Sequence, residues 1–115
     1  MKDIFERIPF CPHGSKASID AFLVAGLIRI EHDLGVEFTY NSGYRCYDCN
    51  VKAGGAVHSA HLRGKAVDIK CTGSRDRLLI LRSAFKMGFR RCGIGHNIVH
   101  LDVDTSLDQD VAWVY

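Results

Sequence analysis

The stretch SAHLRGKAVDIK, residues 59–70, passes from a loop through a glycine into a candidate β-strand. We expect this strand to cover residues 66–71. His61 lies at the end of the loop, and Asp68 follows seven positions later on the strand. A histidine at a loop end and a carboxylate on the following strand can converge on one metal ion. The stretch therefore predicts part of a metal site on a β-sheet.

A third group with zinc-binding chemistry, His100, lies on a later strand candidate, residues 98–103. Antiparallel pairing of the two strands would bring His100 beside Asp68. Two histidines and one carboxylate leave a fourth tetrahedral position for water, as in catalytic zinc sites. Bound zinc lowers the pKa of that water and polarises a carbonyl, which suits amide hydrolysis. Spacing alone does not decide the matter, because six histidines in a short chain also permit ordinary surface or core positions.

Helical spacing of apolar residues marks two further segments. Residues 15–34 predict a helix that Ser15 or Ser18 can cap at its start. Residues 74–87 predict a second helix that ends at a glycine. The apolar face expected for this second helix includes Leu78, Leu81 and Phe85.

The remaining segments complete a small mixed fold. Residues 36–40 predict a strand, and residues 89–94 and 98–103 predict two more around a tight connection. We expect an irregular lead-in over residues 1–15, and a short helix followed by a loop within residues 44–58. The chain, residues 1–115, is thus predicted to be a single α+β domain. Its antiparallel sheet would carry the zinc site and have two or three flanking helices.

Length and charge exclude several classes of protein. A chain of 115 residues fits one domain, and a hydrophobic fraction of 47% is ordinary for a globular protein. A formal charge of +2 is too weak to indicate nucleic-acid binding, and the apolar runs are too short to span a membrane. We expect a monomer. The opening residues MKDIFER lack the features of a signal peptide, so we expect synthesis in the cytoplasm.

The five cysteines cannot all pair in disulfides, because their number is odd. Cys46 and Cys49 form a C-x-x-C pair, which is typical of half a structural zinc site or of a redox pair. Reduced thiols without a special role are the usual state in the cytosol. A disulfide and a second metal remain open alternatives, and so does a structural-zinc or redox protein built on this pair.

Several short motifs occur in one order along the chain. They are SGYR (42–45), Asn50, GGA (54–56), S-x-H-x-x-G-x-A-x-D-I (59–69), GF (88–89), GIG (93–95) and V-H-x-D-V (99–103). This string resembles the zinc D-alanyl-D-alanine carboxypeptidase family, which includes peptidoglycan endopeptidases and phage endolysins. Its metal site is similar to that of the wider group that includes the hedgehog signalling domain. The resemblance runs from about residue 41 to residue 113.

The resemblance implies a role for several residues. The family's zinc ligands map onto His61, Asp68 and His100, and its fold is a small α+β domain with an antiparallel sheet that carries the metal. The arginine of the SGYR motif binds substrate and the oxyanion in the family, which maps onto Arg45. A guanidinium can clamp a carboxylate through two hydrogen bonds. Ser59 is a candidate for orienting a ligand or binding substrate, or else an ordinary loop serine.

The position at which the family carries its general base differs in this sequence. Family members place an acidic residue or a histidine a few positions before the last zinc ligand. Here Asn97 lies three positions before that ligand, and His96 is the only titratable side chain in the stretch. His96 is therefore the candidate proton shuttle, or else a polar residue of a hairpin turn. Asp102 shares a strand face with His100 and is a candidate for orienting its ring.

The sequence therefore predicts a zinc peptidase that acts on the stem peptides of bacterial peptidoglycan. The absence of a signal peptide and the short chain suggest a phage or prophage lysis enzyme that a holin releases or a virion carries. The alternative is a zinc-binding module of the same fold without catalysis, which the missing acid before His100 favours.

Overall fold

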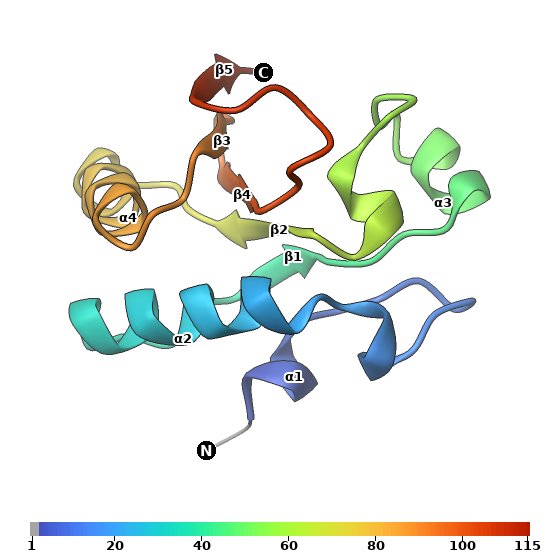
Figure 1. The fold of residues 1–115 in the computed structure, drawn as a ribbon. Coiled ribbons are helices and arrows are strands. Elements are labelled where there is room, and N and C mark those ends of the chain that lie inside the picture. The colour runs from blue at the N-terminus through green and yellow to red at the C-terminus, as the bar shows by residue number, and fades with distance from the viewer. Residues whose placement is uncertain (1–2) are drawn as a thin grey trace.

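A computed structural model describes residues 3–115 of the chain, in which a five-stranded sheet is flanked by helices (Figure 1). The elements in chain order are α1 (Ile4–Arg7), η1 (Lys16–Ser18), α2 (Ala21–Leu34), β1 (Tyr40–Ser42), α3 (Tyr47–Lys52), η2 (Ala60–Arg63), β2 (Ala66–Lys70), α4 (Ser74–Lys86), β3 (Arg91–Ile94), β4 (Ile98–Asp102) and β5 (Val111–Val114). The α+β class predicted from the sequence is confirmed. No helix among residues 3–115 is long and apolar enough to cross a membrane.

The strand order across the sheet is β1-β2-β4-β3-β5. The first three neighbouring pairs are antiparallel, but β5 runs parallel to β3. The prediction of a wholly antiparallel sheet was therefore wrong at this edge. Strand β5 was not predicted from the sequence. Its pairing partner lies about twenty positions earlier in the chain, with Trp113 opposite Gly93.

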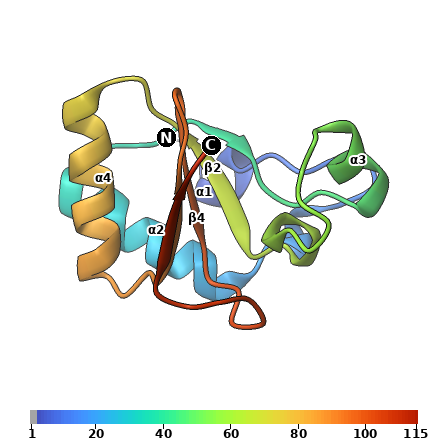
Figure 2. The ribbon, with the colours of Figure 1, turned by 90° about the horizontal axis from the view of Figure 1, so that it is seen from above.

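The two faces of the sheet have different environments. Val67 and Ile69 of β2 and Val99 and Leu101 of β4 are buried in the apolar core. Because successive strand residues point to opposite faces, the residues between them point away from this core. Figures 1 and 2 show α4 and α3 on opposite sides of the sheet. The sheet thus separates the apolar core from a polar face.

Helix α2 begins later than the sequence suggested. Neither Ser15 nor Ser18 caps it; the Asp20 carboxylate instead accepts a hydrogen bond from the Leu23 N–H at 3.0 Å. Residues 16–18 form the separate short helix η1. The lead-in is also not wholly irregular, because Asp3 caps the short helix α1. The first two residues of that lead-in lie outside the described residues.

The apolar face assigned to the second long helix was partly wrong. Leu78 and Phe85 are exposed, whereas Ile80 and Ala84 are buried and Leu81 is partly buried against the core. The buried stripe of α4 is therefore narrower and lies one to two positions from the expected one. The buried residue Ala84 is small, and its size allows α4 to pack closely against α2.

The predicted strand at residues 36–40 is displaced toward the C-terminus. The Phe38 N–H donates to the Glu31 carboxylate at 3.0 Å, and the Val36 N–H donates to the Glu31 carbonyl. These backbone donors are therefore satisfied by helix α2 rather than by a neighbouring strand. Strand β1 begins only at Tyr40. Its pairing with β2 shifts register at Asn41, so that Tyr40 lies opposite Ile69 and Ser42 opposite Asp68.

A buried carboxylate joins helix α2 to the segment before β1. Glu31 accepts two hydrogen bonds from Arg7, at 2.9 and 2.7 Å, and one from the Tyr40 hydroxyl at 2.9 Å. Burial raises the pKa of Glu31, but the hydrogen bonds from Arg7, Phe38 and Tyr40 outweigh it and lower the pKa overall. The charged form is therefore the stable one in the folded protein.

We expect Glu31→Gln to lower the free energy of unfolding at neutral pH by about 3 kcal/mol, because a neutral amide cannot offset the charge of the largely buried Arg7 guanidinium as the carboxylate does. A carboxyl whose pKa is lowered by folding stabilises the protein above its unfolded pKa and less as the pH falls. The variant should therefore lose part of the acid sensitivity of the unmodified protein. Urea unfolding at neutral and acidic pH measures both effects. The control is Glu6→Gln, which changes an exposed carboxylate whose ion pair is with Lys16, and equal stability of the two variants would contradict the prediction.

Candidate metal centre and its cleft

The pairing of β2 with β4 places two candidate ligands side by side. Asp68 lies directly opposite His100 in the antiparallel ladder. His100 Nδ1 lies 3.1 Å from Asp68 Oδ1. Both residues belong to the face of the sheet that points away from the apolar core, because their neighbours along each strand are core residues. This is the juxtaposition that the sequence predicts for the two strands.

The third candidate ligand, His61, reaches the same point from the short helix η2. The Ser59 hydroxyl caps this helix by accepting a hydrogen bond from the His61 N–H at 3.2 Å. The His61 ring is 2% exposed, and its Nε2 lies 3.4 Å from Asp68 Oδ1. Its Nδ1 lies 2.7 Å from the Gly43 carbonyl, which can only accept, so Nδ1 donates and Nε2 keeps its lone pair. Ser59 thus supports the backbone that carries His61.

A buried carboxylate holds the ring of His100. His100 Nε2 lies 2.7 Å from Asp102 Oδ2, and the other oxygen of Asp102 accepts a hydrogen bond from Arg91 Nε at 2.8 Å. Asp102 is 1% exposed. With Nε2–H donating to Asp102, the lone pair of His100 Nδ1 faces Asp68. A carboxylate behind a histidine in this way fixes the tautomer and orientation of a metal ligand.

The electrostatics of the group favour a cation at its centre. Burial raises the pKa of Asp68, but the rings of His100 and His61, when they carry a proton toward it, and the Ser42 hydroxyl outweigh this effect, and the pKa falls far below its ordinary value. Burial lowers the pKa of His100, yet the hydrogen bonds to Asp102 and Asp68 raise it overall. The charged carboxylate is thus stabilised and the ring is drawn toward its protonated form. A divalent cation can take the place of that positive charge.

The three side chains fit a zinc ion by their chemistry. The ligand atoms of His61, Asp68 and His100 all lie within 4.8 Å of one another. Two imidazole nitrogens and one carboxylate oxygen form a donor set that zinc enzymes use, with one position left open. The two nitrogen lone pairs and the carboxylate oxygen also converge. They would repel one another without a proton or a cation between them.

These residues lie in a cleft with a volume of about 670 Å³. Its walls come from the loop between α3 and η2, from the turn between β3 and β4, and from the aromatic residues of the C-terminal segment. Four other candidate site residues from the sequence line this cleft: Arg45, Ser59, His96 and Asp102.

Arg45 and His96 enter the cleft differently. Arg45 is half-buried, and its Nε is buried without a hydrogen-bond partner among residues 3–115. A buried guanidinium nitrogen without a partner is costly, so it favours an acceptor supplied by a ligand. His96 is exposed in the turn before β4, and within the described part of the chain its backbone carbonyl accepts a hydrogen bond from Arg77. Its ring is therefore free to meet a bound molecule at the mouth of the cleft.

Several residues that hold the candidate ligands in place were not predicted from the sequence. The Ser42 hydroxyl donates to Asp68 Oδ2 at 2.6 Å, and the next residue, Gly43, supplies the acceptor for His61. Both belong to the SGYR motif, so the motif was the available signal. Arg91 was not detectable in this way, because its link to Asp102 depends on the register of β3 against β4.

The aromatic wall was also not foreseen. The Trp113 ring lies 5.2 Å from the His100 ring, and the Arg91 guanidinium lies 5.0 Å from the Trp113 ring. Gly93 makes this packing possible, because a Cβ at that position would lie 2.5 Å from the indole nitrogen. Trp113 therefore covers one side of the candidate metal centre.

One comparison with known proteins matches this chain to a protein family. The family model of peptidase M15 matches residues 8–104, a range that includes all three candidate ligands. A search of curated proteins finds no match.

Proposed function

Because this chain belongs to the peptidase M15 family of zinc D-alanyl-D-alanine carboxypeptidases, we propose that it hydrolyses peptide bonds in the stem peptides of bacterial peptidoglycan. The family match indicates a zinc metallopeptidase. We further propose that the protein acts as a monomer at the bacterial cell wall, without a nucleic-acid or membrane partner. A phage lysis enzyme, released through a holin or carried by a virion, fits this proposal.

One observation carries the proposal. His61, Asp68 and His100 converge on one point of a cleft, and the unpartnered Nε of Arg45 lines the same cleft. A metal that polarises a carbonyl beside a cation that binds an anion is a combination that promotes peptide hydrolysis. When bound by these three residues, zinc would activate water and polarise the scissile carbonyl.

The chain's own residues have separate tasks in this proposal. Arg45 binds a substrate carboxylate or the oxyanion that develops on the carbonyl oxygen. His96 takes a proton from the attacking water and returns it to the departing amine. Asp102 keeps the His100 ring in position. Stem peptides suit such a site because they carry free carboxylates, on their terminal D-alanine and on D-glutamyl or diaminopimelyl residues.

We expect Arg45→Lys to keep the zinc and the fold while lowering kcat/KM by roughly 10²-fold, about the loss seen when one donor to an oxyanion is removed. A single ammonium cannot reproduce the planar fork of a guanidinium. Steady-state hydrolysis and zinc content, measured on the same preparation, test this. Lys65→Arg, a change outside the cleft, is the matched control. Unchanged turnover in Arg45→Lys would remove this residue from the mechanism.

Digestion of purified peptidoglycan by the zinc-loaded protein tests the function itself. Mass spectrometry of the products distinguishes release of D-alanine from cleavage within or between stem peptides. Asp68→Ala supplies the inactive control. A protein that holds zinc in the His61–Asp68–His100 site but yields no product from any peptidoglycan would instead be a zinc-binding module without catalysis.

A further inference from the structure

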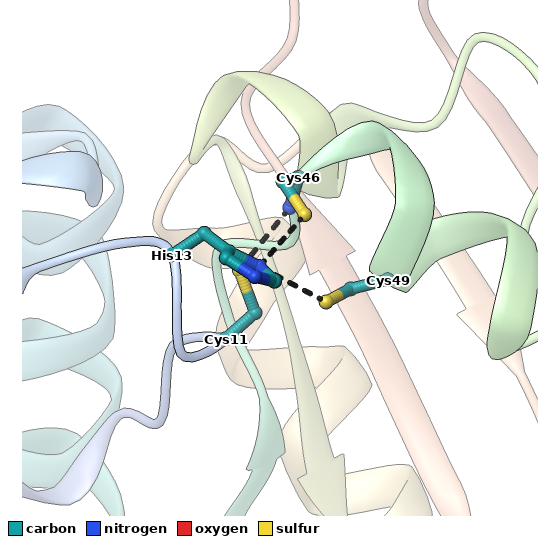
Figure 3. Close-up of side chains that lie close together, drawn as sticks. All are labelled: Cys11, His13, Cys46 and Cys49. Atoms are coloured by element: carbon teal, nitrogen blue, oxygen red, sulfur yellow. Dashed lines mark hydrogen bonds between the residues drawn. The ribbon is translucent and has the colours of Figure 1, made fainter.

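A second cluster of metal-binding side chains lies away from the cleft. It consists of Cys11, His13, Cys46 and Cys49 (Figure 3), and it is called the cysteine cluster below. None of its members lines the cleft that holds the candidate catalytic centre. All five cysteines of the chain are free of disulfides in the structure. Cys46 and Cys49 of the C-x-x-C pair thus lie beside Cys11 and His13, which are about 35 residues earlier in the chain.

The distances within the cysteine cluster match those of a tetrahedral zinc site. His13 Nδ1 lies 3.4 Å from Cys46 Sγ and 3.7 Å from Cys49 Sγ. Zinc bonds of about 2.3 Å to sulfur and about 2.05 Å to nitrogen, at the tetrahedral angle, put those two atoms about 3.6 Å apart. All four ligand atoms lie within 4.8 Å of one another. The cluster thus encloses a space of the size that zinc needs.

The hydrogen bonding at the cluster is also that of a metal-binding thiolate. The Cys46 N–H donates to Cys11 Sγ at 3.3 Å. An N–H aimed at sulfur stabilises negative charge on that sulfur, and the thiolate is the form that binds metal. A single ring nitrogen cannot satisfy two thiols as both donor and acceptor. A cation at the centre satisfies all four groups at once.

The cysteine cluster lies in a lobe, residues 9–18 and 43–64, that is outside the apolar core. Among the described residues, none from 9–18 or 43–64 belongs to the apolar core cluster. In helix α3 only Asn50 is buried, while Tyr47 and Val51 are exposed. Segments that lack a core of their own are commonly stabilised by a bound metal. The cysteine cluster joins the two parts of this lobe, since Cys11 and His13 lie in one and Cys46 and Cys49 in the other.

We propose that the cysteine cluster holds a second zinc ion, with four protein ligands and a structural role. Four protein ligands fill the tetrahedral positions, so this ion has no open position for substrate. Its effect on the cleft is indirect. Cys46 follows Arg45 in the chain, and the Arg45 N–H donates to the His61 carbonyl at 3.1 Å. The second zinc ion therefore anchors the segment that presents Arg45 to the cleft.

Loading the full chain with cobalt tests the proposal with a spectroscopic readout that activity does not provide. Cobalt bound by thiolates shows intense sulfur-to-metal charge-transfer absorption, which two histidines and a carboxylate cannot produce. We expect the unmodified protein to bind about two cobalt ions per chain and to show this absorption. Asp68→Ala should bind about one ion and keep the absorption in full, so the result does not depend on the peptidase proposal.

Variants of the cluster complete the test. Cys49→Ser should lose most of the charge-transfer absorption and about one ion per chain, and it should unfold at a lower temperature. Cys71→Ser removes a buried thiol outside the cluster and should leave the absorption unchanged. A folded Asp68→Ala protein without sulfur-to-cobalt absorption would overturn the proposal, even if Cys49→Ser does not fold. So would a native mass that is two hydrogens short, because it would show a disulfide in place of the metal.

Discussion

Replacing Asp68 with alanine should remove about one zinc ion per chain and reduce hydrolysis by roughly 10³-fold or more. A metal that polarises a carbonyl contributes several kcal/mol to the rate, and each 1.4 kcal/mol or so is a factor of ten. Asp68 is the residue that both histidines face, at 3.4 Å from His61 and 3.1 Å from His100. Its loss therefore removes the negative charge at the centre of the site, and the two imidazoles alone would bind zinc weakly.

Zinc content by elemental analysis, hydrolysis of peptidoglycan and circular dichroism, measured side by side, test this expectation. His61→Ala and His100→Ala should have the same effect as Asp68→Ala. Lys70→Ala is a matched control on the same strand, because Lys70 is exposed and lies outside the cleft. If all three ligand variants keep the zinc content of the unmodified protein, the catalytic metal lies elsewhere.

The second large effect is expected from His96. His96→Ala should keep its zinc and its fold, yet lose roughly 10²- to 10⁴-fold in rate, the usual contribution of general acid–base catalysis. Its ring is exposed at the cleft, and the backbone carbonyl rather than the ring is engaged by Arg77. Asn97→Ala changes the adjacent exposed residue of the same turn and should have little effect. Normal turnover of His96→Ala would mean that the proton moves through another group.

A variant of Asp102 should lose zinc affinity, whereas a variant of His96 should keep it. This difference distinguishes a residue that orients the zinc ligand His100 from the general base. Both carboxylate oxygens of Asp102 are occupied, one by His100 and the other by Arg91 and the Asp104 N–H. Asp102→Asn should therefore weaken zinc binding by about 10- to 100-fold, with a loss of activity that added zinc partly restores. A variant that binds zinc as tightly as the unmodified protein and is inactive would make Asp102 the base instead.

Much of the fold was predictable where the pattern was local. The helices around residues 21–34 and 74–86 and the paired strands β2 and β4 follow from spacing along the chain. Strand β5 was missed because its parallel pairing with β3 depends on a distant partner. The strand expected at residues 36–40 was displaced because the side chain of Glu31 accepts a hydrogen bond that a strand would otherwise make.

The candidate metal sites were also predictable only in part. The convergence of His61, Asp68 and His100 was predictable because a motif and strand pairing point to it. The cysteine cluster was only half visible, since C-x-x-C marks Cys46 and Cys49 but nothing in the spacing marks His13 as their neighbour. Contacts between segments about 35 residues apart arise from the tertiary fold, and local sequence patterns do not encode them.

The alternation along β2 and β4 also limits how this protein can be engineered. Each candidate ligand on these strands has core residues on both sides, Val67 and Ile69 around Asp68, and Val99 and Leu101 around His100. Repacking the core at any of these positions would move the backbone on which a ligand is mounted. Stabilising substitutions are better sought on the outer surfaces of α2 and α4, where exposed apolar residues such as Phe22 and Leu78 can become polar. Substitutions there can raise the thermal stability of the protein without moving the candidate ligands on β2 and β4.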